Sequence, residues 1–286
     1  MNDRAIGIFD SGLGGLTVVS EILAAMPEED VIYLGDSARV PYGIKSAETI
    51  RRFALEDAAF LLSKQPKLLV VACNTASAAA IEAIEQCSSV PVVDVIRPGA
   101  AEAVRATDGA IGVVGTEATI ASGAYRRAIH ELDSDRQVIE AACPLLVPIV
   151  EEGRDPSDPI VLHVLADYLA RLQRLRPGVL ILGCTHYPLL SAAISKLMGP
   201  EVKLVSSASA AAQYVRFVMA ESGMRRRTGT QGLVSCYTTD NSARFSRLAG
   251  RFIGPRSQLE SVEHIGTEDL AEALESLGGS LRTPLP

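Results

Sequence analysis

Short apolar runs alternate with alanine-rich amphipathic stretches along this chain, and that alternation constrains its fold most. Most runs are apolar at every position, so helices must cover both faces of the sheets that they form. The sequence therefore predicts an α/β fold with mostly parallel sheets, whose ligands bind beyond the carboxyl ends of the strands. The expected strands are Ala5–Phe9, Val31–Leu34, Leu68–Ala72, Val90–Val95, Ala110–Val114, Gln137–Ala141, Val179–Leu182, Val202–Val205, Leu233–Cys236 and Leu259–Val262. The expected helices include Ala47–Leu62, Ala76–Glu85, Pro98–Ala106, Pro159–Leu175 and Ala208–Met219.

Two motifs occur twice. IGIFDSGLGG, which begins at Ile6, returns in altered form as IGVVGTEATI, which begins at Ile111, and VVACNTAS around Cys73 is matched by LILGCTHYP around Cys184. Nearly the same length of chain separates the two copies in both cases. Such a duplication predicts two similar α/β domains related by a pseudo-twofold axis, with the active site in the cleft between them.

The segment after about residue 207 has no partner in this repeat, so we expect it to return to the first half of the molecule. We therefore expect residues 1–96 and 208–286 to form the first domain, which carries Cys73. Residues 97–207 would form the second domain, which carries Cys184.

Cys73 and Cys184 each follow an apolar run and open onto a threonine-containing turn. A thiol has an ordinary pKa of about 8.5, so a modest electropositive environment makes it a useful base near neutral pH. Either cysteine alone could be a small buried hydrophobic residue. As a duplicated pair on opposite walls of a cleft, however, the two thiols could remove a proton from one side of a substrate and return one from the other.

Polar residues follow both cysteines. Asn74 and Thr75 come where a helix is expected to begin, and free N–H groups there bind carboxylates, although either residue could simply cap the helix. After Cys184 come Thr185 and His186, and the histidine could keep the thiol poised, relay a proton, or be a hydrogen-bonded loop residue. Glu151 could hydrogen-bond His186, but we favour an exposed hinge at this position.

The first expected strand leads into Asp10, Ser11 and a glycine-rich loop. The glycines let backbone approach a ligand, but their spacing is not that of a dinucleotide-binding loop. Asp10 could bind an ammonium group, tune a thiol, or cap a helix. Thr116 and Thr119, in the repeat counterpart of this loop, are further carboxylate-binding candidates.

The second expected strand leads into Asp36 and then into the rigid turn Pro41-Tyr42-Gly43. Backbone N–H groups of such a turn can bind an anion. We expect Asp36 to brace the loop instead of contacting the ligand.

Composition excludes several classes of function. The 286 residues carry a formal net charge of −7, so no global basic field would attract nucleic acid or an anionic membrane. No apolar run approaches the length of a membrane span, and we expect a cytoplasmic protein. The five cysteines lack CxxC spacing, which favours neither disulfides nor a metal site, and we expect Cys87, Cys143 and Cys236 to pack in the core. No lysine follows an expected strand convincingly, so pyridoxal phosphate has no obvious anchor, and we expect no cofactor.

Six motifs together resemble the cofactor-independent glutamate racemases of the aspartate/glutamate racemase superfamily, over about residues 6–205: IGIFDSGLGGLTV, YLGDSARVPYG, VVACNTASA, IGVVGTEATIASGAY, CPLLVPIVEEG and LGCTHYPLL. The resemblance implies interconversion of L- and D-glutamate, which supplies D-glutamate to peptidoglycan. It assigns acid/base roles to Cys73 and Cys184, assisted by Asp10 and His186. The residues implied to hold the substrate, beside those four and Pro41, are Ser11, Tyr42, Gly43, Asn74, Thr75, Thr116, Thr119 and Thr185.

Three alternatives share parts of this pattern. A racemase for aspartate or another small acidic compound would use the same mechanism. A thiol redox protein is disfavoured because paired redox cysteines are usually close in sequence. An amino-acid binding protein could use the same cleft, but it would not need two thiols. We expect glutamate as the small-molecule partner, a homodimer, and no nucleic-acid or membrane partner.

Overall fold

The computed structural model describes residues 3–226, 228–254 and 259–278. In this part of the chain the strands form two sheets, and neighbouring strands run parallel throughout. The larger sheet has the order β10-β9-β2-β1-β3-β4, from β1 (Ile6–Asp10), β2 (Val31–Gly35), β3 (Leu68–Val71), β4 (Val92–Asp94), β9 (Val234–Thr238) and β10 (Leu259–His264). The smaller sheet has the order β6-β5-β7-β8, from β5 (Ile111–Gly115), β6 (Val138–Ala142), β7 (Val179–Gly183) and β8 (Lys203–Ser206). The predicted α/β class with parallel sheets is therefore confirmed.

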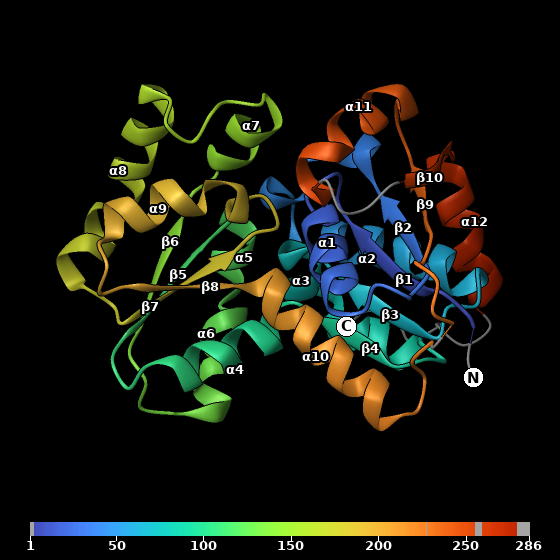
Figure 1. The fold of residues 1–286 in the computed structure, drawn as a ribbon, viewed down its shortest axis with the longest axis horizontal. Coiled ribbons are helices and arrows are strands. Elements are labelled where there is room, and N and C mark those ends of the chain that lie inside the picture. The colour runs from blue at the N-terminus through green and yellow to red at the C-terminus, as the bar shows by residue number, and fades with distance from the viewer. Residues whose placement is uncertain (1–2, 227, 255–258, 279–286) are drawn as a thin grey trace.

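Helices cover both faces of the larger sheet (Figure 1). The helices are α1 (Leu16–Ala25), α2 (Ala47–Ser63), α3 (Asn74–Cys87), α4 (Ile96–Ala106), α5 (Glu117–Ser122), α6 (Ala124–Leu132), α7 (Leu146–Glu151), α8 (Pro159–Leu175), α9 (Ser191–Met198), α10 (Ser207–Glu221), α11 (Ser242–Ile253) and α12 (Thr267–Leu277), with short 3₁₀ turns at Ser37–Arg39, Tyr42–Ile44 and Tyr187–Leu190. On one face of β1, Ile6 and Ile8 share a core with α1, while Phe9 shares a second core with α2. Because side chains alternate across a strand, a strand between two such cores must be apolar at every position.

The two sheets form two halves of the molecule, with α10 between them (Figure 1). α10 contacts α1 in the half that holds β1, and α4 in the half that holds β5–β8. The strands β1–β4, β9 and β10 fall within the expected first domain, and β5–β8 within the second. The boundaries at residues 96/97 and 207/208 stay predictions, and residues 279–286 of the expected first domain lie outside the described residues.

Three elements differ from expectation because side chains near their ends form local hydrogen bonds. β4 stops at Asp94, whose carboxylate accepts hydrogen bonds from the backbone N–H groups of Ile96 and Arg97 and so starts α4 earlier than expected. α3 begins at Asn74, because the sulfur of Cys73 accepts a hydrogen bond from the N–H of Ala76 and caps the helix. These changes lie directly beyond the carboxyl end of a strand, where the ligand-binding residues were expected.

Candidate active site

The loop after β1 folds around the carboxylate of Asp10. One oxygen, Oδ2, accepts hydrogen bonds from the backbone N–H groups of Gly12 at 3.3 Å and Gly15 at 2.9 Å. The other, Oδ1, is buried and has no hydrogen-bond partner among the described residues. Burial raises the pKa of Asp10, although the charge of His186 and the two N–H donors oppose that rise.

Cys73 lies between β3 and α3. Its side chain is buried, and its sulfur lies 3.7 Å from the hydroxyl oxygen of Ser11 and 3.4 Å from the N–H nitrogen of Ala76. Burial raises the pKa of the thiol strongly, and the negative charge of Asp10 raises it further. Cys73 is therefore a protonated thiol at neutral pH, suited to donating a proton.

Cys184 follows β7 and has a different electrostatic environment. Its sulfur lies 3.9 Å from Nδ1 of His186, whose Nε2 lies 3.2 Å from Oε1 of Glu151. Burial by itself lowers the pKa of His186, but the contacts with Cys184 and Glu151 and the charge of Asp10 raise it to about 10. A protonated imidazole donates from both nitrogens, so it stabilises negative charge on the Cys184 sulfur.

Glu151, at the end of α7, is only partly exposed, and its hydrogen bond with His186 lowers its pKa. The favoured interpretation of this position as an exposed hinge was therefore wrong. α7 carries the carboxylate to the histidine, which lies far along the chain. For that reason, local sequence favoured the simpler interpretation.

The glycine-rich loop after β1 approaches the loop that carries Cys184 through residues with small side chains. A Cβ atom on Gly14 would lie 2.2 Å from the hydroxyl oxygen of Thr185, so only glycine fits there. The Thr17 hydroxyl donates to the backbone carbonyl of Thr185 at 3.0 Å. The glycine-rich loop after β1 thus holds the loop that carries Cys184 and His186.

Three threonine hydroxyls join the two halves on the other side of the site. Thr75 on α3 lies 2.9 Å from Thr116 and 3.2 Å from Thr119, and the last two lie 2.9 Å apart. Thr116 also caps α5 by accepting a hydrogen bond from the N–H of Thr119. In this structure the hydroxyls bind one another, and as donors they can turn to a carboxylate placed between the halves.

Tyr42 and Gly43 form part of a loop that a buried ionic cluster holds. The Tyr42 hydroxyl lies within hydrogen-bond distance of both Asp36 and, at 2.9 Å, Asp57. Arg39 bridges Asp36 at 2.6 Å and Asp57 at 3.0 Å, and also pairs with Glu56. Asp36 thus braces the loop, whereas sequence reasoning missed the other charged members of the cluster. For Glu56 and Asp57, the signal was a pair of acidic residues on an otherwise apolar stretch of α2.

These residues enclose a cavity of about 360 Å³. Asp10, Thr119 and Asp36 do not line this cavity, but each forms a hydrogen bond with a residue that does. Cavity-lining residues that sequence reasoning missed include the apolar Val40, Ile44, Val147 and Pro148, which carry no distinguishing chemical signal. The expected site residues that do line it are Ser11, Pro41, Tyr42, Gly43, Cys73, Asn74, Thr75, Thr116, Cys184, Thr185, His186 and Glu151.

The cysteines of the structure are not joined in disulfides. All five cysteines are free. Among the residues whose structure is described, no three histidine, cysteine or carboxylate side chains gather as a metal site would require. None of the described helices is both long and apolar enough to span a membrane.

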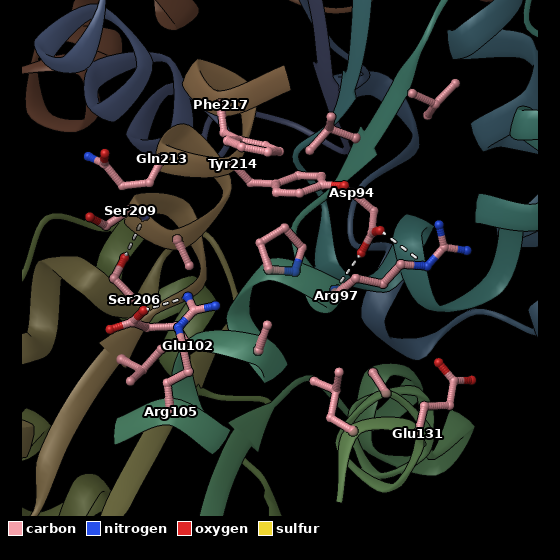
Figure 2. A pocket seen from close by; sticks show the side chains of 18 of the residues that line it. Asp94, Arg97, Glu102, Arg105, Glu131, Ser206, Ser209, Gln213, Tyr214 and Phe217 are labelled. Carbon is pink, nitrogen blue, oxygen red and sulfur yellow. Dashed lines mark hydrogen bonds and ion pairs between the residues drawn. The ribbon is translucent and has the colours of Figure 1, made fainter. Parts of the chain in front are cut away.

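A second, larger groove of about 940 Å³ lies between α4, α6 and α10, beside β4 and β8 (Figure 2). Its charged side chains are largely paired, as Arg97 with Asp94 and Arg105 with Glu102. The described residues that line it include neither cysteine nor histidine. Acid/base chemistry at a thiol therefore belongs to the smaller cavity.

Fold and site together define a class: a two-sheet α/β protein whose acid/base site contains two free thiols at the ends of equivalent strands. The family model described as Asp/Glu/Hydantoin racemase matches residues 9–215. Among curated relatives, the glutamate racemase of Geobacter metallireducens is 51% identical over 88% of this chain and 93% of its own, and that of Chlorobaculum tepidum is 44% identical over 93% and 97%. The chain belongs to the Asp/Glu/hydantoin racemase family, in its glutamate racemase branch.

Solved structures agree with this assignment. A glutamate racemase of Francisella tularensis, in complex with D-glutamate, superposes with a TM-score of 0.86 at 35% identity, covering 94% of this chain and 99% of its own. A glutamate racemase isoform of Bacillus anthracis superposes with a TM-score of 0.87 at 40% identity, covering 92% of this chain and 97% of its own. The expected family is thus confirmed.

Proposed function

We propose that this protein interconverts L- and D-glutamate by a two-thiol acid/base mechanism, without a cofactor, and supplies D-glutamate for peptidoglycan. One observation carries the proposal: Cys73 and Cys184, both free, line one cavity of a size suited to a small amino acid. A relative that matches nearly the whole chain has been solved in complex with D-glutamate, which supports the choice of substrate.

The two sulfurs have opposite electrostatic partners. Cys184 lies beside His186, which is protonated below about pH 10, whereas Cys73 lies near the buried carboxylate of Asp10. One sulfur is therefore suited to carrying negative charge and the other to carrying a proton. This asymmetry supplies the base and the acid that one direction of racemisation needs.

From L-glutamate, the Cys184 thiolate takes the α-proton while the Cys73 thiol gives a proton to the opposite face of the α-carbon. One C–H bond breaks as an S–H bond forms at Cys184. At Cys73 an S–H bond breaks as the new C–H bond forms. The reverse reaction starts from D-glutamate with Cys73 as the base. Asp10 and His186 would return the sulfurs to their starting protonation states.

The α-proton of an amino acid is far less acidic than a thiol, so the protein must stabilise the charge that develops on the α-carboxylate. Fixed donors in a water-poor site do this most effectively. The hydroxyls of Thr75, Thr116 and Thr185 and the amide of Asn74 supply such donors on the cavity wall. Because they come from both halves, closure of the halves around the substrate would complete the site.

Circular dichroism tests the function directly. Purified protein without added cofactor should abolish the optical signal of either L- or D-glutamate over time. The enantiomers have equal free energies in water, so kcat/KM must be the same from both sides. Faster turnover of aspartate in a substrate panel would favour a different racemase. Tight binding of glutamate without loss of optical signal would favour a binding protein.

We further propose that the protein is located in the cytoplasm and forms a homodimer. Free cysteines persist in a reducing compartment, which supports the location. The half-exposed Tyr214 and the more exposed Phe217 stack on α10 beside the larger groove (Figure 2), and exposed apolar surface of this kind often marks protein contacts. Light scattering after size-exclusion chromatography should give twice the chain mass of 30.3 kDa.

A further inference from the structure

Tyr125 connects the two halves of the molecule beside the thiols. It lies on α6, in the core that holds β5 and β7, and its side chain is fully buried. Its hydroxyl donates a hydrogen bond of 2.7 Å to Oδ1 of Asn74, the first residue of α3 in the other half. Asn74 directly follows Cys73, so this bond ends one residue from a thiol.

The ring of Tyr125 reaches the second thiol loop. A Cβ atom on Gly183 would lie 2.9 Å from Cε2 of the ring, so the glycine backbone packs directly against it. Gly183 immediately precedes Cys184. One side chain therefore contacts the neighbour of each cysteine, through its hydroxyl on one side and its ring on the other.

The hydroxyl also fixes the orientation of an amide. Burial raises the pKa of Tyr125, so the phenol stays protonated and needs an acceptor, which Oδ1 of Asn74 provides. Nδ2 of Asn74 then points away from the tyrosine. Nδ2 is buried without a hydrogen-bond partner in the described part of the chain, while Asn74 lines the cavity. A buried N–H donor without an acceptor is unfavourable unless a bound ligand accepts its hydrogen bond.

We propose that Tyr125 is a positioning residue for racemisation, which orients the Asn74 amide toward a carboxylate of bound glutamate and supports the backbone that leads into Cys184. The inference rests on the proposed function and adds a residue that acts on both thiol loops. A tyrosine that merely filled the core would act through packing alone. Phenylalanine, which keeps the ring, separates these roles.

The test measures racemisation by wild type, Tyr125→Phe, Asn74→Ala and the double variant. Loss of one orienting hydrogen bond should lower kcat/KM of Tyr125→Phe about tenfold. Because the hydroxyl acts through Asn74, adding Tyr125→Phe to Asn74→Ala should cause little further loss. Tyr168→Phe is the control: the Tyr168 side chain is partly exposed, its hydroxyl accepts a hydrogen bond from the N–H of Leu145, and the variant should keep wild-type activity.

A structural role for the hydroxyl predicts a different result. Tyr125→Phe would then lower the thermal midpoint while its folded fraction kept wild-type kcat/KM, and the inference would be wrong. Fully multiplicative losses in the double variant would also overturn it, because the two side chains would act independently. A wild type that binds but does not racemise glutamate would overturn the proposed function, and this inference with it.

Discussion

Arg39 should be critical for the stability of the loop that carries Tyr42. Arg39→Met keeps the apolar stem but removes the positive charge that pairs with Asp36, Asp57 and Glu56. The Asp36 and Asp57 side chains are fully buried, and leaving buried carboxylates without their cation costs about 3–5 kcal/mol. The Tyr42 hydroxyl still lies within hydrogen-bond distance of both carboxylates and can donate its proton to either, so we expect a loss near the lower end, about 3 kcal/mol.

The loss should depend on pH in a defined direction. Even with Arg39 present, burial and the neighbouring Asp36 raise the pKa of Asp57 well above 3.8. A carboxyl whose pKa is raised by folding stabilises the folded state at low pH, and that contribution disappears as the pH rises through the folded pKa. Without the cation the pKa of Asp57 rises further, so the deficit of the variant should be larger at pH 8 than at pH 5.

Thermal and urea denaturation at both pH values measure this effect. A loss of about 3 kcal/mol corresponds to a midpoint lower by about 6–12 °C for a chain of this size. Arg52→Met is the matched control, since Arg52 is largely exposed and lies 3.8 Å from Glu56, a pair worth at most about 1 kcal/mol. Equal destabilisation by the two variants, or a deficit that shrinks from pH 5 to pH 8, would refute the reasoning.

Two further perturbations test the cavity. In Gly43→Ala the new Cβ would lie 2.7 Å from Cβ of Thr116 in the other half, so KM for D-glutamate should rise about tenfold. Gly250→Ala is the control: a Cβ at that position has no neighbouring side chain within 4 Å, and KM should stay unchanged. His186 has a pKa of about 10 in the folded protein, against an ordinary 6.5. Its protonation therefore contributes stability to wild type that is fully present below about pH 6.5 and is lost as the pH rises through about 10. The excess unfolding free energy of wild type over His186→Gln in urea should therefore shrink across that interval, and a constant difference would contradict the assigned pKa.

The sequence predicted the parallel sheets and most of the polar residues that line the smaller cavity because their signals are local. A strand packed on both faces must be apolar throughout, and residues at the carboxyl ends of parallel strands gather at one edge. The repeat added the pairing of Cys73 with Cys184. These inferences needed only the strand positions and the order of motifs along the chain.

The missed features depend on contacts between distant segments. The Arg39 cluster forms only when α2 packs against the loop after β2, and Tyr125 meets Asn74 only when the halves are assembled. Glu151 reaches His186 because α7 folds back over the loop after β7. The different environments of the thiols also come from such contacts, so duplicated motifs suggested a symmetry that the charges do not have.

The origin of the proton in the product tests the two-thiol account most directly. In deuterated water at early times, L-glutamate should yield D-glutamate that carries solvent deuterium at the α-carbon, while unreacted L-glutamate keeps its protium. Cys73→Ala and Cys184→Ala should each abolish racemisation. Product that retains the original protium would show that a single group removes and returns the proton, and full turnover by both variants would contradict the account in the same way.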